Sequence, residues 1–296
     1  MNPTQETLPP QVSVLITSFN SVVPLRRSLA ALEASEARDC MEILVVDGGS
    51  RDGSAAVDTD FPGVTVMRLP RYFGATKMRN IGVRTAKGEY ILFLSPTVLV
   101  RPDTVRLLAD AMETSPELGA VSPLVLDGAG QPARQLMPLP TPLNIGEAAG
   151  GNLSEIAAAA GEGALDVDIP TFKALMTRRQ TIAGMNYLDE RFGEAWSDVD
   201  LCYKLRKAGK KIQVLRDVRA DEAPDGLWRP STSVAAAFAA DRAVGASRFA
   251  GKHFSGLMGA QLRATTLLKA LGSGQLSAFT RIANGQIIDG TEVISG

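Results

Sequence analysis

The sequence predicts an α/β protein with a mixed, mainly parallel sheet flanked by helices and a helical C-terminal tail. Strand-like apolar runs alternate with amphipathic helical stretches through the first half of the chain. Polar residues directly follow several of these runs, as expected where parallel strands present their carboxyl ends to a ligand. With 296 residues, the chain is long enough for one large domain or two smaller ones.

Strands are predicted where β-branched and large apolar residues are bounded by turn signals. Because most of these runs are joined by helical stretches, the connections should be right-handed crossovers between parallel strands. In chain order, the predicted strands span residues 12–17, 43–46, 64–69, 89–94, 119–125, 172–177 and 212–215.

Helices are predicted where apolar residues recur with a period near 3.6 residues. The segment 138–163 is rich in proline, glycine and alanine, which favours a surface excursion with at most one short helix, of the kind that covers binding clefts. The predicted helices span 23–34, a short stretch through 55–57, a segment that follows a loop at Gly74 and Ala75, then 102–114, 196–208 and an alanine-rich tail from 231 to about 271.

Composition excludes several classes of function. The 31 basic and 32 acidic residues nearly balance, which argues against a nucleic-acid binder. Cys40 and Cys202 are too few for a disulfide framework, and a single histidine, His253, excludes histidine-rich metal sites. The first residues show no basic leader, and every apolar run is shorter than a membrane span. We therefore expect a cytoplasmic protein without a nucleic-acid partner.

One stretch organises the rest of the chain, the buried strand that ends at Asp47. Gly48, Gly49 and Ser50 follow it directly. An acidic side chain at the carboxyl end of a buried strand, beside flexible glycines, is typical of a ligand site in an open α/β sheet. The alternative is that Asp47 only caps the next helix, although Ser50 and Asp52 are also available for capping.

A second candidate site follows the third strand. Lys77, Arg79 and Arg84 lie on a helix that begins near Gly74. A helix N-terminus and clustered cations both favour bound anions. The alternative is a solvated helix face, which fits Arg84 better than the two residues nearer the helix start.

Four ordered motifs carry a resemblance to a known family. The chain resembles the family 2 glycosyltransferases of the GT-A type, particularly their rhamnosyltransferase-like branch, over residues 12–215 and more weakly to 254. The motifs are VSVLITSFN, ILVVDGGSRDGS, RNIGVRTAKGEYILFL and LDERFGEAWSDVDLCYKLRKAG.

The resemblance implies a nucleotide-sugar donor and an acceptor that is a glycan or lipid-linked, of the cell-envelope or exopolysaccharide type. Asp47 would accept a hydrogen bond from the base, and Asp198 would be the catalytic base of an inverting transfer. Asp198 could instead cap its helix, and Asp200 should be structural. The remaining residues expected to bind the donor are Thr17, Asn20, Lys77, Arg79 and Ser95.

Three departures from the family pattern stand out. Thr97 occupies the usual position of a metal-binding aspartate, and Ser197 replaces the glutamate of an acidic pair. A hydroxyl is a poor ligand for Mg²⁺ or Mn²⁺. A histidine expected after the last strand is also missing, and His253 lies too far along to replace it. The need for a divalent metal therefore stays open, and without one Lys77, Arg79 or Arg71 would have to supply the charge.

Two functions consequently remain. The chain is either a glycosyltransferase or an inactive GT-A-like domain that binds nucleotide or scaffolds a partner. We expect a glycosyltransferase-like domain over residues 1–230 and a helical extension packed on it over 231–296. The extension is locally basic, which suggests either contact with an anionic membrane surface or simple packing on its own domain. Its cations are Arg242, Arg248, Lys252, Arg263 and Lys269.

Overall fold

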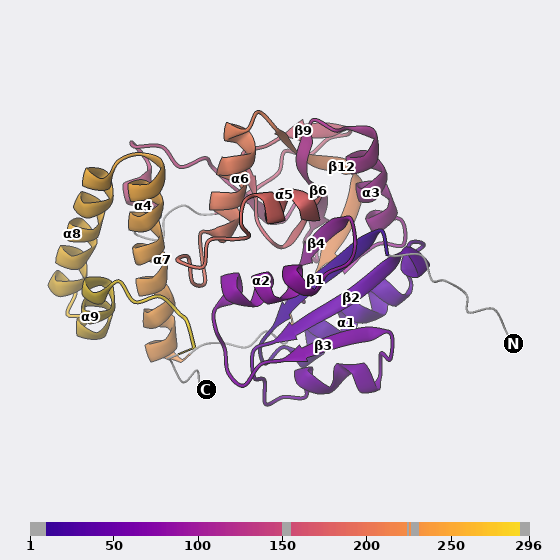
Figure 1. Cartoon of the computed structure of the whole chain (residues 1–296), viewed down its shortest axis with the longest axis horizontal. Coiled ribbons are helices and arrows are strands. Elements are labelled where there is room, and N and C mark those ends of the chain that lie inside the picture. Colours follow the sequence, from indigo (N-terminus) through magenta and orange to yellow (C-terminus); the bar gives the residue numbers. More distant parts are fainter. Residues whose placement is uncertain (1–9, 150–154, 224, 226–230, 291–296) are drawn as a thin grey trace, which may run out of the picture.

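The structure, a computed structural model, describes residues 10–149, 155–223, 225 and 231–290. A twisted sheet forms the body of the protein, and a group of helices from the C-terminal part lies at one end (Figure 1). The main sheet has nine strands, eight of them in the order β3-β2-β1-β4-β11-β6-β12-β5, and the ninth, β9, pairs with β12.

Most predicted strands are confirmed, with small shifts at their ends. The first four strands form a parallel unit with β1 at its centre, as the alternation of strand and helix predicts. The next strands are mixed, because β11 runs antiparallel to β4 and β6 while β12 runs parallel to β6. The bounds are β1 Val12–Ser18, β2 Met41–Asp47, β3 Val64–Arg68, β4 Tyr90–Leu94, β5 Val98–Val100, β6 Leu118–Leu126, β9 Ala164–Asp166, β11 Ala174–Arg178 and β12 Lys211–Glu222.

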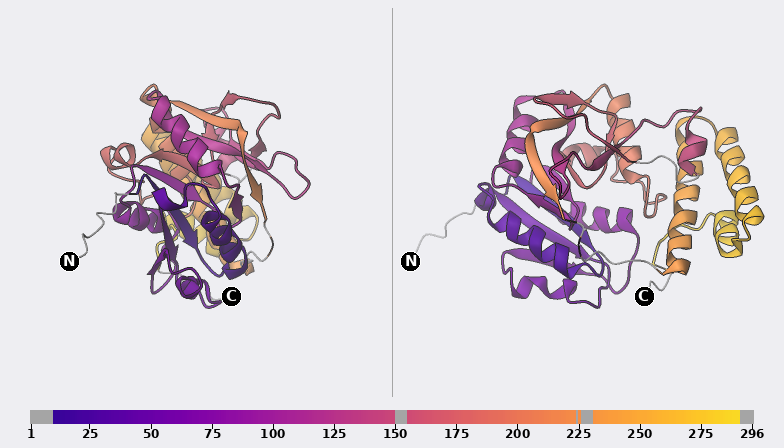
Figure 2. Two further views of the ribbon diagram at one scale, coloured as in Figure 1. Left: turned by 90° about the vertical axis from the view of Figure 1, so that its right-hand side faces the viewer. Right: turned by 180° about the vertical axis from the view of Figure 1, so that it is seen from behind.

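Helices cover both faces of the sheet, as Figure 2 shows from two further sides. Val14 and Ile16 of β1 pack with the apolar residues of α1 and α3, whereas Leu15 between them packs with Met78 and Val83 of α2. This alternation buries the strand on both faces, as its nearly continuous apolar sequence requires. The bounds are α1 Val22–Glu33, α2 Ala75–Thr85, α3 Thr104–Thr114, α5 Arg179–Gly184 and α6 Ser197–Lys207, with 3₁₀ turns at Arg38–Cys40 and Ser54–Thr59.

The predicted excursion contains more structure than expected. It holds the one short helix, α4 (Ile145–Ala149), but also β8 (Ile156–Ala157), which pairs with β7 (Arg134–Met137). With β10 (Ile169–Pro170), these strands form a second, three-stranded sheet. The predicted last strand is also longer, because β12 continues past an irregularity after Leu215 and pairs with β5.

The predicted helical tail consists of three helices, α7 (Thr232–His253), α8 (Gly256–Gly272) and α9 (Leu276–Asn284). Its cations mostly serve internal contacts. Arg248 and Arg263 donate to backbone carbonyl groups, and Lys252 binds two carboxylates. Among the described helices, we find none that combines the length and the apolar character needed to cross a bilayer. Contact of the tail with a membrane surface stays a prediction.

Candidate active site

The register of the sheet brings the ends of β2, β1 and β4 to one edge. Ser18, the last residue of β1, lies opposite Asp47, and Ser95 follows β4 at the level of Thr17. Neighbouring strands are about 4.8 Å apart, so Asp47 and Ser95 are separated by about 10 Å across β1. The strand-end residues predicted from the sequence therefore share one edge.

Asp47 forms the turn after β2 and still keeps one free oxygen. Its Oδ1 accepts hydrogen bonds from the N–H groups of Gly49 at 3.1 Å and Ser50 at 2.9 Å. Its Oδ2 is buried and has no hydrogen-bond partner in the protein. A buried carboxylate oxygen without a partner is costly unless a ligand supplies a donor. Asp47 thus shapes the turn after β2 and keeps a free acceptor, but it does not cap the next helix as the alternative interpretation proposed, because that helical turn begins at Ser54.

Asn20 joins the loops that follow β1 and β2. Its backbone has a φ of 45°, in the left-handed region, where asparagine is tolerated. Its N–H donates to Ser50 Oγ at 2.8 Å, and its Oδ1 accepts from the N–H of Arg51 at 2.8 Å. Asn20 therefore shapes the predicted nucleotide pocket through the backbone around it. Thr17, the other residue predicted here, is the penultimate residue of β1 and is partly buried.

Asp198 lies in the first turn of α6. The helix begins at Ser197, so Asp198 does not cap it as the alternative interpretation required. Its Oδ1 accepts from the N–H of Val199 at 2.9 Å, and the N–H of Phe172 donates to the same carboxylate. Burial raises the pKa of Asp198, and the nearby Arg79 opposes this shift. A carboxylate tuned in this way is suited to accept a proton.

Asp198 belongs to the same edge as Asp47. Phe172, which donates to Asp198, directly precedes Lys173, and the carbonyl of Lys173 accepts from the N–H of Ser95 at 2.8 Å. The base candidate therefore lies beside the end of β4. One further strand, β1, separates β4 from β2 and Asp47.

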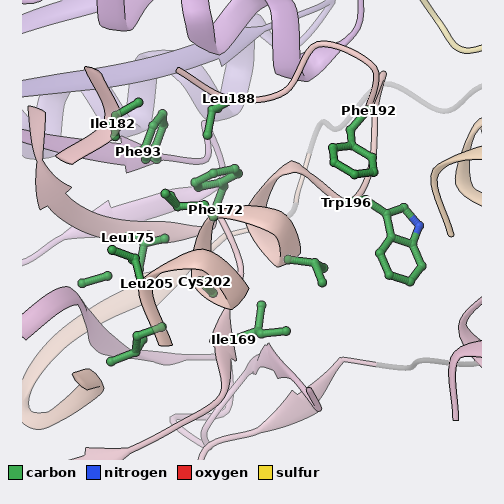
Figure 3. Close-up of a cluster of buried hydrophobic side chains, with 14 of the residues drawn as sticks. Phe93, Ile169, Phe172, Leu175, Ile182, Leu188, Phe192, Trp196, Cys202 and Leu205 are labelled. Carbon is green, nitrogen blue, oxygen red and sulfur yellow. The ribbon is translucent and has the colours of Figure 1, made fainter. Parts of the chain in front are cut away.

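Arg79 contacts the elements that carry Asp198. Its guanidinium lies 4.4 Å from the centre of the Phe172 ring, which also packs against Phe93 in the core shown in Figure 3. Nη1 of Arg79 lies 3.4 Å from Ser197 Oγ. Burial lowers the pKa of Arg79, while Asp198 and Glu194 raise it. Glu194 thus places a second carboxylate near Arg79, although Ser197 has replaced the glutamate of the family pattern.

Glu194 and Tyr72 belong to this site, and the sequence analysis did not identify either. The hydroxyl of Tyr72 donates to Glu194 Oε2 at 2.5 Å, and the N–H of Ala75 donates to the same oxygen at 3.0 Å. Tyr72 also packs beside Gly48, where an added Cβ would lie 2.7 Å from its ring. Glu194 therefore links the loop before Asp198 to the loop between β3 and α2, which packs on the turn after Asp47.

These contacts limit the number of free N–H groups at the start of α2. The first N–H of the helix donates to Glu194, and the next, from Thr76, donates to the carbonyl of Gly193 at 3.0 Å. The first two N–H groups of the helix are therefore bound by the protein, which leaves mainly the cations of the helix to favour an anion.

Lys77 and Arg71 lie against the same aromatic ring. Lys77 Nζ is 4.7 Å and Arg71 Cζ 5.3 Å from the centre of the Phe73 ring. The loop that carries Arg71 packs closely on the turn after β2, where a Cβ on Gly49 would lie 3.0 Å from Cα of Arg71. The two cations therefore lie next to the Asp47 turn.

Ser95 and Thr97 form a closed pair of hydroxyls at the end of β4. Their oxygens are 2.8 Å apart, and Thr97 is 4% exposed. The GT-A type implies a divalent metal at this place, and hard cations select anionic oxygens. Two hydroxyl groups that bind each other do not fit that ion.

Asp200 has the structural role expected for it. Its carboxylate binds Lys204 at 2.7 Å, Lys252 at 2.8 Å and His253 at 2.7 Å, and its side chain is 2% exposed. The network fastens α6 to α7. His253 accordingly lies at this contact and does not take the position of the missing family histidine.

Asp241 of α7 holds the loop before Asp198 from behind. Its Oδ1 accepts from the N–H groups of Glu194 at 3.0 Å and Ala195 at 3.3 Å, and its Oδ2 accepts from the N–H of Ile288 at 2.8 Å. Burial raises the pKa of Asp241 to about 6, against the lowering effect of these bonds. The C-terminal segment is thereby joined to the candidate site.

This raised pKa predicts a pH-dependent stability. Because the pKa is higher in the folded than in the unfolded chain, the contribution of Asp241 is full below the ordinary pKa of aspartate and declines as the pH rises to about 6. We expect the difference in free energy of unfolding between wild type and Asp241→Asn to change by about 3 kcal/mol across this window. Urea unfolding of both proteins at a series of pH values measures it, and a pH-independent difference would refute the assignment.

Comparisons with known proteins show similarity to glycosyltransferases. Residues 13–154 match the model of the family described as "Glycosyl transferase family 2". The succinoglycan biosynthesis protein ExoO of Rhizobium meliloti is 30% identical over 133 residues, which are 43% of this chain and 38% of that protein. An uncharacterized glycosyltransferase of Haemophilus influenzae is 27% identical over 111 residues, 37% of each chain. The match thus spans well under half the length of these curated relatives.

Solved structures show the same fold at low sequence identity. The mannosyltransferase PcManGT from Pyrobaculum calidifontis, solved with GDP-Man and Mn²⁺, has a TM-score of 0.56 and 19% identity over 94% of this chain and 80% of its own. GalNAc-T7, solved with UDP, GalNAc and Mn²⁺, has a TM-score of 0.58 and 18% identity over 77% of this chain and 46% of its own.

The rhamnosyltransferase-like branch stays a prediction, because the comparisons do not separate it from the rest of the family. Residues 13–154 are therefore similar to the family 2 glycosyltransferases, and the fold of the chain is that of solved GT-A glycosyltransferases.

Proposed function

We propose that this chain transfers a sugar from a nucleoside diphosphate donor to a hydroxyl group of an acceptor, with inversion at the anomeric carbon. The observation that carries the proposal is the buried, unpartnered Oδ2 of Asp47, on the same sheet edge as Asp198. An N–H group of a nucleobase would supply the hydrogen-bond donor that this oxygen lacks in the protein. Uracil and thymine offer one at N3, and guanine offers one at N1.

The donor would lie along the edge from Asp47 to Asp198. Thr17 and Asn20 would line the pocket of the nucleoside, next to the turn that Asn20 braces. Arg79, Lys77 and Ser95 would then face the diphosphate. About three strand spacings, roughly 14 Å, separate β2 from β11, which suits an extended nucleoside diphosphate sugar.

Asp198 would act as the base of the transfer. It would take the proton of the acceptor hydroxyl while that oxygen forms a bond to the anomeric carbon. The bond from the anomeric carbon to the diphosphate oxygen breaks in the same step, and the nucleoside diphosphate leaves with the electron pair. One direct displacement inverts the configuration. Arg79, beside Asp198, is placed to stabilise negative charge on the leaving oxygen.

The acceptor is proposed to be a growing glycan or lipid-linked sugar of the cell envelope or of an exopolysaccharide. Support comes from ExoO, whose name assigns it to succinoglycan biosynthesis. We also propose that residues 1–230 form the transferase domain and that 231–296 are an extension, in a protein that acts on the cytoplasmic side of the membrane.

A second function is favoured by the hydroxyls of Thr97 and Ser197. Both stand where the family pattern has a carboxylate, and a site that has lost both could bind a nucleotide without turning it over. Such an inactive domain would keep Asp47 and the fold and would act as a nucleotide sensor or a scaffold for a partner enzyme.

A donor panel distinguishes the two functions. The protein is incubated with UDP-, dTDP- and GDP-sugars, with and without a mixture of lipid-linked and oligosaccharide acceptors, and the released nucleoside diphosphate is measured. The transferase predicts release from at least one donor that increases when an acceptor is present. Binding of a nucleotide without release from any donor would instead establish the inactive domain.

A further inference from the structure

We propose that the diphosphate is bound without a divalent metal ion and that the guanidinium of Arg79 takes over the charge that a metal would neutralise. The inference rests on the proposed function, whose donor site it describes in more detail. Three features of the structure lead to it. They are the two hydroxyl groups that bind each other after β4, the nearby carboxylates that already form ion pairs with cations, and the cations that face the site.

The hydroxyl pair leaves no ligand set for a hard cation. Ser95 Oγ and Thr97 Oγ1 bind each other at 2.8 Å, and the N–H of Thr97 lies 3.3 Å from Ser95 Oγ. The carbonyl of Thr97 accepts from the N–H of Ala223 at 2.8 Å. Mg²⁺ and Mn²⁺ sites that hold a nucleoside diphosphate use one or two carboxylates to fix the ion, and this turn has none.

The nearest carboxylates in the sheet are already neutralised. Strand β12 pairs with β5, which places Asp221 and Glu222 beside the residues that follow Thr97. Asp221 forms a two-pronged ion pair with Arg101, at 3.0 and 3.1 Å, and Glu222 pairs with Lys173 at 3.1 Å. Within the described part of the chain, histidine, cysteine, aspartate and glutamate nowhere gather in a group of three that could hold a metal.

Arg79 is the cation best placed to replace the metal. Its guanidinium lies over the Phe172 ring, with Cζ 4.4 Å from the ring centre, and Phe172 donates its N–H to Asp198. Its edges can donate up to five hydrogen bonds in a geometry that matches phosphate. Among the described residues its guanidinium has one such bond, a long one of 3.4 Å to Ser197. The diphosphate end next to the anomeric carbon would therefore meet Arg79.

Arg71 and Lys77 extend this positive charge toward the Asp47 turn. Both lie on the Phe73 ring, and neither forms an ion pair with any residue that the structure describes. Since the first two N–H groups of α2 are bound to Glu194 and Gly193, these side chains are the main source of attraction for the anion.

Calorimetric titration with UDP, dTDP and GDP tests the inference directly. Each is added to protein treated with EDTA and to protein with added MnCl₂, and we expect dissociation constants that agree within about twofold. Nucleotide binding that weakens tenfold or more in EDTA and returns with Mn²⁺ would overturn metal independence while leaving the proposed function intact. Absence of binding by every nucleotide in both conditions would overturn both.

Substitutions at Arg79 identify the replacing cation. Arg79→Gln is expected to weaken UDP binding by about tenfold to a hundredfold, the size of a lost charge-assisted hydrogen bond, and to leave UMP within about twofold. Arg79→Lys should recover part of the UDP affinity. Equal losses for UMP and UDP would show a structural effect and overturn the assignment of the charge to Arg79.

A gain-of-site variant completes the test. Ser95→Asp with Thr97→Asp restores two carboxylates at the end of β4, and it should bind Mn²⁺ in the presence of UDP, measured by loss of the free-ion signal in electron paramagnetic resonance. The matched control is Thr265→Asp on the exposed face of α8. The loss of free Mn²⁺ caused by UDP without protein is the baseline. A wild-type protein that lowers free Mn²⁺ below this baseline as strongly as the double variant would contradict the inference.

Discussion

Replacing Asp198 with asparagine is expected to lower turnover of the donor by about 10²- to 10⁴-fold, the range supplied by a general base. The amide is nearly isosteric, and its oxygen can still accept from the N–H of Val199, so the start of α6 should keep its structure. Nucleotide affinity should therefore stay within about twofold. Single-turnover kinetics and calorimetry on the same preparation separate the two effects.

The control for this substitution is Asp103→Asn. Asp103 precedes α3 and makes no capping hydrogen bond with its side chain, so the change alters one aspartate near a helix start without touching the site. It should turn over the donor like wild type. If Asp198→Asn retained wild-type turnover, another group would have to be the base and the assigned mechanism would be wrong.

The pH profile provides a second reading of Asp198. Since burial raises its pKa and the base acts only when ionised, kcat/KM should rise with pH through a value above that of an ordinary carboxyl group. Arg79→Lys keeps the positive charge beside Asp198, so it should preserve the pH at which kcat/KM rises better than Arg79→Gln does. If kcat/KM instead rose at the ordinary pKa of aspartate, the catalytic base would not be the buried Asp198.

Replacing Asp47 with asparagine is expected to reverse the choice of base. The N–H groups of Gly49 and Ser50 fix the amide oxygen in the place of Oδ1, so the amide NH₂ group occupies the place of Oδ2. It then opposes the N3–H of uracil or thymine and matches N3 of cytosine, which is an acceptor. Affinity for UDP or dTDP should fall by about 10²-fold, because a buried donor would face another donor.

Calorimetry with UDP, dTDP, GDP and CDP on wild type, Asp47→Asn and Asp47→Ala measures this effect. The alanine variant loses the turn contacts as well and should bind none of the four. The asparagine variant should gain affinity for CDP relative to UDP. Unchanged UDP affinity in both variants would show that the nucleobase does not bind Asp47.

The sequence predicted those parts of the site that depend on local pattern. Asp47 ends a strand buried on both faces, and parallel pairing with β1 brings it opposite Ser18, one residue beyond the level of Thr17 and Ser95. Asp198 was found through a family motif, and the structure explains its position through Phe172. In both cases a short stretch of chain contains the signal.

The contacts that the sequence did not reveal join residues far apart in the chain. Glu194 meets Ala75 across 119 positions and Tyr72 across 122, and Asp241 reaches Ile288 across 47. No periodicity or spacing encodes such pairs. A weak local signal did exist for Glu194, an unexplained acid three residues before Ser197, where the family carboxylate is missing.

The same limit applies at the start of α2. A helix N-terminus beside Lys77 and Arg79 predicts a bound anion only if the first N–H groups are free, and their occupation by Glu194 depends on a loop over one hundred residues later. The length of β12 was missed for a related reason, since its second half is stabilised by pairing with β5, a three-residue strand that has no sequence pattern of its own.

The most direct measurement is a crystal structure of the chain with UDP or dTDP bound in the presence of EDTA. We predict the N3–H of the base on Asp47 Oδ2, the diphosphate on Arg79, and Asp198 beyond its terminal phosphate. A nucleotide bound at another place, for example in the cavity of about 630 Å³ beside Asp189 and Arg248, would contradict this account of the site.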